Sequence, residues 1–166
     1  ISNKKTVSGA TAMGDLDNDG DLDLVVSNLH EKVALYINQT NEKANYLKLK
    51  LKHPAPNTFG IGTKVYAYHQ GKLQYKELYT VRGFQASSEP IVHFGVGDIQ
   101  KIDSLRIVWP NKTYQTLKDV AVNQQLIISP ENTKPFDVSV LKKKVKPLFK
   151  EVANNLGIDF THVEDN

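Results

Sequence analysis

The chain has no cysteine among its 166 residues. This absence excludes a disulfide framework and a thiol nucleophile, and it fits either a reducing cytoplasm or a cysteine-poor bacterial surface protein. Long hydrophobic runs are also missing, because no stretch approaches the roughly 18 to 20 apolar residues that a membrane-spanning helix needs. The N-terminus has no segment of the signal-peptide type. We therefore expect no membrane span in this chain.

Motifs for catalysis and for transition-metal binding are equally scarce. The histidines show neither an H-x-H nor an H-E-x-x-H spacing; they are His30, His53, His69, His93 and His162. Ser87 and Ser88 lie upstream of His93, but without a G-x-S-x-G elbow a Ser-His-acid triad is disfavoured. A histidine beside an aromatic residue in a strand is more often a packing residue than a ligand. We therefore expect no enzymatic activity and no catalytic residue.

The content of 40% hydrophobic and 23% charged residues is that of an ordinary globular protein of one or two domains. Charge is unevenly distributed along the chain, so the net charge of +3 is an average over unlike segments. Residues 1–40 hold six acids against three lysines, whereas residues 41–129 hold twelve Lys and Arg against six acids. A net charge of this origin does not indicate nucleic-acid binding.

The acids of the N-terminal part gather in GDLDNDGDLDLVVSN, residues 14–28. Its aspartates occupy every second position: Asp15, Asp17, Asp19, Asp21 and Asp23. In a D-x-D-x-D-G loop the first, third and fifth carboxylates turn toward Ca2+, and glycine at the sixth place, here Gly20, lets the chain bend around the ion. We expect the seventh residue to offer its backbone carbonyl and the ninth a further carboxylate.

Without a cation, each pair of these carboxylates would repel at a cost on the order of 1 kcal/mol or more. We therefore predict Ca2+ as the cofactor, bound by all five aspartates; a solvated acidic turn is the alternative. An EF-hand is disfavoured because its twelfth position requires Glu between helices, whereas Val26 stands there in a strand-like run.

Short runs rich in Val, Ile and Tyr predict strands at Val7–Met13, Leu22–Val26 and Val33–Ile37 around this loop. Further on, alternating apolar residues surround a turn at Gln70–Gly71, which predicts an antiparallel hairpin. Later strand-like runs have a similar spacing; they are 91–96, 105–109, 114–117 and 125–128. Near the C-terminus, apolar residues at helical spacing predict one short helix over 147–156, ended by Gly157. The predicted fold class is all-β: an antiparallel β-sandwich or barrel-like domain with a short C-terminal helix.

The aspartate loop and its exit into a strand resemble, over about Ser8 to Thr40, the FG-GAP or VCBS-type repeat of integrin-like β-propellers. This resemblance implies a partial propeller blade in residues 1–44. Because a propeller closes with four to eight blades, the strands of one blade must pack on the next domain, pair between molecules or stay partly exposed. We expect the chain to be an excerpt of a longer protein, with neighbouring blades elsewhere in the parent.

Ordered motifs in the middle of the chain resemble the ASPIC/UnbV domain, which accompanies VCBS repeats in cartilage-acidic-protein-like and bacterial surface proteins. They are Asn45–Leu47, Phe59–Val65, Val92–Gly97, Val108–Lys112, Gln115–Leu117 and Asn123–Leu126. The chain departs from the usual pattern at Thr63, where Ala is common, and at Asn111–Lys112, where Ser-Gly is common. The implied organisation is a blade piece at 1–44, a β-domain at 45–129, and a linker, a helix and the start of a further module at 130–166.

From this resemblance we expect a non-catalytic, Ca2+-binding module for adhesion or for binding an extracellular protein or glycan. The expected location is extracellular, cell-surface or periplasmic. The alternative is an accessory, carbohydrate-directed domain of a secreted enzyme, for which Trp109 would be a surface platform. Tyrosines interleaved with lysines between 64 and 79 leave a nucleic-acid-binding β-domain as a less favoured alternative.

Overall fold

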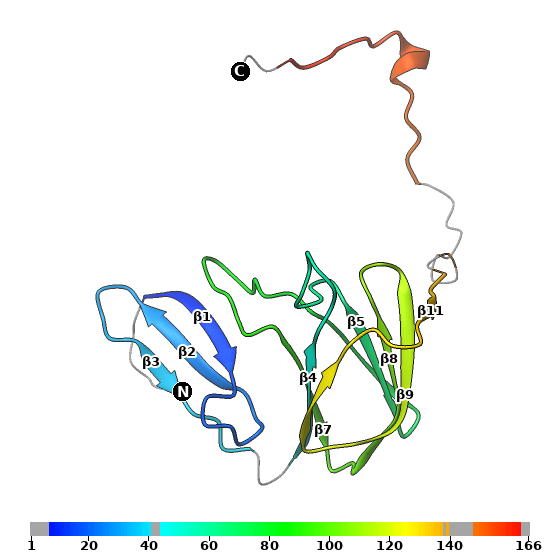
Figure 1. Cartoon of the computed structure of the whole chain (residues 1–166). Helices are drawn as coiled ribbons and strands as arrows, with labels where there is room; N and C mark the ends of the chain where they lie inside the picture. The colour runs from blue at the N-terminus through cyan, green and yellow to red at the C-terminus, as the bar shows by residue number, and fades with distance from the viewer. Residues whose placement is uncertain (1–6, 41–43, 138, 140–147, 164–166) are drawn as a thin grey trace. The chain divides into compact units, whose positions relative to one another are not determined.

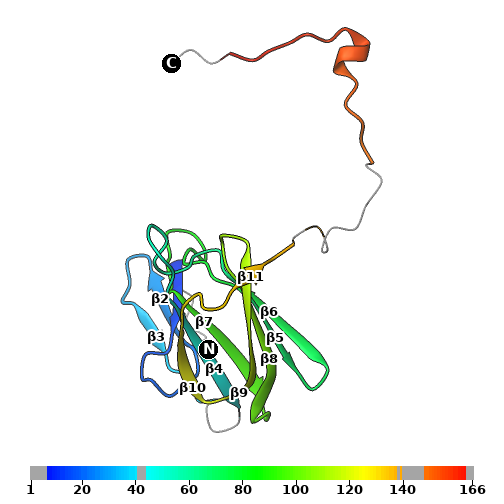
Figure 2. The same ribbon diagram turned by 45° about the vertical axis from the view of Figure 1, so that its right-hand side comes forward.

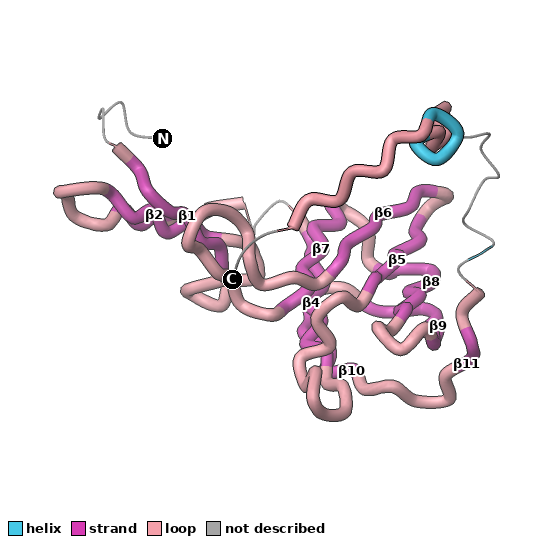
Figure 3. The backbone as a smooth tube through the Cα atoms, turned by 90° about the horizontal axis from the view of Figure 1, so that it is seen from above, coloured by secondary structure: helices cyan, strands magenta, loops and turns pink. Residues whose placement is uncertain are grey.

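The computed structural model describes residues 7–40, 44–137, 139 and 148–163. The chain divides into two compact units, residues 1–136 and 137–166. The first unit is built of strands, which Figure 1 shows from blue to yellow and Figure 3 in magenta. Within the described ranges, the structure contains no helix with the length and hydrophobicity of a membrane span.

A three-stranded antiparallel sheet opens the first unit. Its strands are β1 (Ser8–Gly14), β2 (Asp23–Asn28) and β3 (Ala34–Tyr36), in the order β1-β2-β3. The register pairs Gly14 with Asp23, so the residues between them form the loop of a β-hairpin. We call residues 15–22 the acidic loop. The three strands predicted around the aspartates are therefore confirmed.

Two further sheets form a β-sandwich. The smaller sheet has the order β10-β4-β7, with strands β10 (Gln124–Ile128), β4 (Asn45–Leu51) and β7 (Ile91–Gly97). The larger has the order β11-β9-β8-β5-β6, with strands β11 (Lys134–Pro135), β9 (Thr113–Ala121), β8 (Lys101–Val108), β5 (Lys64–His69) and β6 (Lys72–Glu77). Of the two architectures left open by the sequence, the sandwich is the one observed.

Period-two burial explains how the two sheets face each other (Figures 1 and 2). In β4 the side chains of Leu47, Leu49 and Leu51 are buried, and in β5 those of Val65 and Ala67 are buried. Alternate residues of a strand point to opposite faces of a sheet, so each strand offers one apolar face to the shared core. Strands β4 and β10 are parallel, whereas the other strand pairs are antiparallel.

The hairpin predicted at Gln70–Gly71 joins β5 to β6. Gln70 and Gly71 have φ of 47° and 72°, the positive values that a two-residue hairpin turn of type I′ requires. The following connection, residues 78–90, is anchored where buried Leu78 exchanges backbone hydrogen bonds with Thr63 and Gly62. This connection runs from the edge strand β6 of one sheet to β7 of the other.

The predicted C-terminal helix is much shorter than expected. A four-residue 3-10 helix, Ala153–Leu156, is followed by Gly157 in the left-handed conformation, whereas residues 148–152 are not helical. Pro147 lies outside the described residues. Leu148 and Phe149 are 92% and 90% exposed, and a helix this short is not stable in water unless its apolar face packs. The amphipathic spacing was therefore insufficient for a regular helix.

The predicted boundaries at 44/45 and 129/130 stay predictions. Two observations describe the strands next to these boundaries. Strand β4 begins at Asn45, and the pairing of β11 with β9 extends the larger sheet beyond Ser129. The strand pairs of the sandwich therefore run from residue 45 to residue 135.

Thr63→Val is expected to raise the free energy of unfolding by about 1 kcal/mol. Thr63 is fully buried, and its Oγ1 has no hydrogen-bond partner among the described residues. Valine keeps the volume of threonine and removes the unpaired hydroxyl. Urea unfolding measures the effect. Thr63→Ser is the matched control, because it keeps the hydroxyl and loses the methyl group; a valine variant no more stable than the native chain would contradict the argument.

Candidate metal centre

The acidic loop lies against the outer face of the smaller sheet. In β4, Tyr46 and Lys48 alternate with the buried leucines and therefore point away from the core. In β7, His93 alternates in the same way with Val92 and Phe94. The register places Lys48 directly opposite His93, so a lysine, a histidine and a tyrosine gather on one solvent-side face.

Side-chain carboxylates hold the backbone of the loop in a tight turn. The backbone N–H of Gly20 donates to Asp15 Oδ2 at 3.1 Å, which closes the loop across five residues. The N–H of Asp19 donates to Asp17 Oδ1 at 3.3 Å, and the N–H of Asp21 donates to Asp19 Oδ1 at 3.1 Å. Gly20 has a φ of 104°, which side-chain-bearing residues rarely adopt. The predicted bend at this glycine is confirmed.

Three of the five aspartates converge. One carboxylate oxygen from each of Asp15, Asp17 and Asp19 lies within 4.8 Å of the others, and we call these residues the aspartate triad. The Asp15 side chain is only 4% exposed, and its Oδ1 is a buried atom without a hydrogen-bond partner in the described part of the chain. A buried carboxylate oxygen is costly unless a donor or a cation satisfies it. Within the described residues, Asp15 Oδ1 is therefore a buried acceptor that no donor satisfies.

The carboxylates of the other two aspartates contact backbone amides and a hydroxyl. Buried Asp23 accepts hydrogen bonds from Leu16 N–H at 2.7 Å and from Asn38 N–H at 2.8 Å, one on each oxygen. One oxygen of Asp21 accepts from the backbone N–H and the hydroxyl of Thr40, at 2.9 and 3.2 Å. These contacts fasten the acidic loop to the segment that follows β3. Their part in metal binding stays a prediction.

Three contacts attach the loop to the sandwich. The Lys48 ammonium forms an ion pair with Asp15 Oδ2, beneath the triad. His93 Nε2 lies 2.7 Å from the Gly20 carbonyl oxygen and must carry the proton, because a carbonyl can only accept. The Tyr46 ring stacks on His93, with 6.0 Å between ring centroids, and lies against Gly20. His93, which the sequence left as a packing residue, is thus one of three residues that hold the loop.

Burial, hydrogen bonds and neighbouring charges shift two pKa values in the site. Burial lowers the pKa of His93, and this outweighs the hydrogen bond to Gly20, so the imidazole is neutral near pH 7. For Asp19 the hydrogen bond from Asp21 N–H acts to lower the pKa. Desolvation and the charges of Asp17, Asp21 and Asp15 together raise it above the ordinary value. Repulsion from the neighbouring carboxylates thus disfavours the charged form of Asp19.

Two other residues considered as functional candidates from the sequence, Trp109 and Ser88, make contacts that stabilise the fold. Trp109 is 2% exposed and donates its indole N–H to Gln115 Oε1 at 3.1 Å in the core. Ser88 Oγ accepts from Met13 N–H at 3.4 Å, and within the described residues no hydrogen bond joins Ser88 to His93. Sequence reasoning missed Tyr46 and Lys48. The alternation in β4 indicates that both face outward, but nothing in the sequence indicates that the acidic loop covers them.

These observations define the class: a two-sheet β-sandwich module that carries an acidic hairpin loop on the outer face of its smaller sheet. The sequence model of the family described as ASPIC and UnbV matches residues 53–135, which is half of the chain. The chain belongs to the ASPIC and UnbV family. The match begins after β4 and ends at β11, so it covers most of the sandwich. No curated protein matches the chain significantly.

Proposed function

We propose that the acidic loop binds Ca2+ and that the chain is a non-catalytic, Ca2+-stabilised interaction module. The observation that carries the proposal is the convergence of the aspartate triad, in which Asp15 also has a buried oxygen, Oδ1, without a hydrogen-bond partner among the described residues. Hard carboxylate oxygens on a flexible loop are the ligands that Ca2+ accepts. Asp15, Asp17 and Asp19 would supply these oxygens.

The local charge supports a divalent ion. The three carboxylates of the triad carry three negative charges, and the Lys48 ammonium on Asp15 compensates one of them. Two negative charges remain, which one Ca2+ would neutralise. The ion would remove the repulsion that raises the pKa of Asp19. Because the loop contacts Lys48 and His93, bound Ca2+ would also stabilise the packing of the β1-β2 hairpin on the sandwich.

The hairpin is proposed to be part of an FG-GAP or VCBS-type blade. The D-x-D-x-D-G spacing, the strand pair β1-β2 and the third strand β3 support this assignment. Large apolar side chains are also exposed in β3 and beside it: Leu35 within the strand, and Val33 and Ile37 at its two ends. Neighbouring blades in a parent protein would cover such residues.

The proposed role is adhesion or the binding of an extracellular protein or glycan, at a cell surface, outside the cell or in the periplasm. Extracellular Ca2+ sites operate with dissociation constants of about 10^-4 to 10^-3 M, which a site of few protein ligands can reach. The buried position of Trp109 disfavours the alternative of a carbohydrate platform built on that residue. No catalytic role is proposed for any residue.

Calorimetric titration of Ca2+ tests the proposal. The native chain should bind one ion per molecule, and Asp19→Ala should abolish the binding because it removes one of three converging carboxylates. Asp98→Ala is the matched control: it removes an exposed carboxylate from the end of β7, outside the acidic loop, and should leave the affinity unchanged. Equal Ca2+ binding by the native chain and the Asp19 variant would overturn the assignment.

A further inference from the structure

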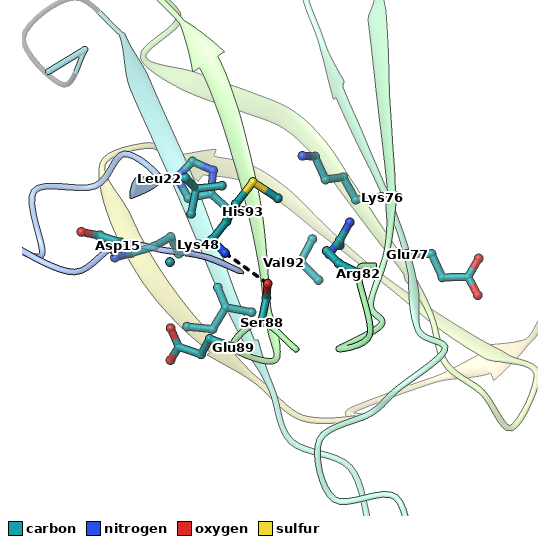
Figure 4. Close-up of a pocket in the computed structure, with 13 residues that line it drawn as sticks. Asp15, Leu22, Lys48, Lys76, Glu77, Arg82, Ser88, Glu89, Val92 and His93 are labelled. Carbon is teal, nitrogen blue, oxygen red and sulfur yellow. Dashed lines mark hydrogen bonds and ion pairs between the residues drawn. The ribbon is translucent and has the colours of Figure 1, made fainter. Parts of the chain in front are cut away.

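A second feature of the outer face is a cavity of about 90 Å3 beside the metal centre. Its walls come from the end of β1, from β4, β6 and β7, and from the connection between β6 and β7. The cations Lys48, Lys76 and Arg82 line it together with the hydroxyl of Ser88, and Figure 4 labels all four. Three acids belong to the same lining: Asp15, Glu77 and Glu89.

Two of these cations have no counter-ion. Lys48 is paired with Asp15, but among the described residues neither Lys76 nor Arg82 forms an ion pair. The Arg82 guanidinium lies over the Tyr79 ring, 5.3 Å from its centroid, which leaves its N–H groups available at the edges. Lys76 and Arg82 are thus two cations of the cavity wall without an ion-pair partner among the described residues.

Two acids of the cavity lining, Glu77 and Glu89, are not paired with these cations. Glu77 lies 3.7 Å from Lys64 and accepts a hydrogen bond of 2.8 Å from the Tyr75 hydroxyl. Figure 4 shows the Glu77 carboxylate to the right of Arg82 and the Glu89 carboxylate at the lower left, near Ser88. Among the described residues neither carboxylate forms an ion pair with Lys76 or Arg82. A neutral hydroxyl is present instead: Ser88 Oγ accepts from Met13 N–H and keeps its own proton available for donation.

The electrostatic surroundings of Lys76 agree with an unsatisfied site. Its side chain lies at the surface, yet desolvation of the ammonium, and after it the positive charge of Arg82, lowers its pKa. The negative charge of an anion placed between the two cations would raise the pKa of Lys76 and so oppose both effects.

We propose that this cavity binds a divalent oxyanion, a sulfate or phosphate group, with Lys76 and Arg82 as its cationic ligands and the Ser88 hydroxyl as a neutral donor. Arginine and lysine form charge-assisted hydrogen bonds to tetrahedral oxyanions, which are stronger than neutral ones. The group can be a free ion or the end of a phosphate monoester, which carries close to two negative charges near pH 7. The apolar side chains of Met13, Leu22 and Val92 on the same walls would contact the organic part of an ester.

This site is distinct from the Ca2+ site, although Asp15 and Lys48 belong to both surroundings. The two cations that carry the proposal make no contact with the aspartate triad among the interactions described. Oxyanion binding is therefore expected in excess chelator as well as in Ca2+. Failure of one proposal does not imply failure of the other.

Isothermal titration with sodium sulfate, in chelator and at an ionic strength held constant with sodium chloride, tests the proposal. We expect saturable binding of one sulfate per chain. Lys76→Gln and Arg82→Gln should each weaken it about tenfold, the loss of one charge-assisted contact. Lys72→Gln is the matched control, because Lys72 is also exposed on β6 but does not line the cavity. Both test residues are exposed, and melting curves verify that each variant is folded.

Comparison of sodium phosphate with phenyl phosphate, both largely dianionic at pH 8, distinguishes a free ion from an ester. Tighter binding of the ester would assign the cavity to an ester group, and equal or weaker binding would assign it to the free ion. Heats no larger than those of sodium chloride would overturn the proposal. The proposal would also be overturned if the Lys76 and Arg82 variants bound sulfate as tightly as the Lys72 variant does.

Discussion

Replacement of Trp109 by alanine is expected to lower the free energy of unfolding by about 3 to 5 kcal/mol, the usual cost of truncating a large aromatic side chain in a core. Trp109 is 2% exposed, belongs to the hydrophobic core of the sandwich and lies 5.6 Å from the ring of His53, between centroids. Its indole N–H also makes a buried hydrogen bond to Gln115. Urea unfolding followed by circular dichroism measures the loss.

Trp109→Phe is the matched control, because it keeps an aromatic ring and removes the indole N–H. The Gln115 acceptor oxygen still receives the Glu131 N–H at 2.9 Å, so it is not left unsatisfied. The phenylalanine variant should therefore lose much less stability than the alanine variant. An alanine variant as stable as the native chain would mean that Trp109 is a surface residue, and it would restore the carbohydrate platform as an explanation.

Gly20→Ala is expected to cost about 3 kcal/mol and to abolish Ca2+ binding. A methyl group on Gly20 would lie 1.9 Å from Cε1 of Tyr46, which no van der Waals contact permits, so the loop or the ring must move. The φ of 104° adds strain for any residue with a side chain. Because the same loop holds the aspartate triad, displacement of Gly20 separates the carboxylates. Urea unfolding and Ca2+ titration measure the two effects.

Gly71→Ala separates strain from collision. Gly71 also has a positive φ, of 72°, but a methyl group there would meet nothing within 4 Å. This variant should cost about 1 kcal/mol, the penalty for a left-handed residue alone. If Gly20→Ala lowers the free energy of unfolding no more than Gly71→Ala does, the acidic loop does not pack against Tyr46. The contact described between the loop and the smaller sheet would then be wrong.

Much of the fold follows from local pattern. Alternation of leucine with polar residues in β4 and of valine and alanine with tyrosine in β5 gives both the strands and their buried faces. The turn at Gln70 and Gly71 sets the β5-β6 register. The bend at Gly20 and the convergence of the first three aspartates follow from loop spacing, because these depend on residues close in sequence.

Features that depend on distant residues could not be predicted. The parallel pairing of β10 with β4 joins segments more than 70 residues apart. The contact of the acidic loop with Lys48 and His93 depends on how two sheets meet, and alternation alone does not indicate it. The cavity beside the metal centre is likewise lined by residues from segments that lie far apart in the sequence. The C-terminal apolar spacing shows the opposite case, in which a local pattern without a packing partner does not produce the predicted helix.

Thermal unfolding of the native chain in 10 mM Ca2+ and in excess chelator tests the central claim most directly. A ligand that binds only the folded state stabilises it by RT ln(1 + [L]/Kd), so a site with a Kd of about 10^-4 M should add roughly 2.7 kcal/mol. The account predicts a melting temperature several degrees higher in Ca2+, with no such difference for Asp19→Ala. Coincident melting curves of the native chain in Ca2+ and in chelator would contradict it.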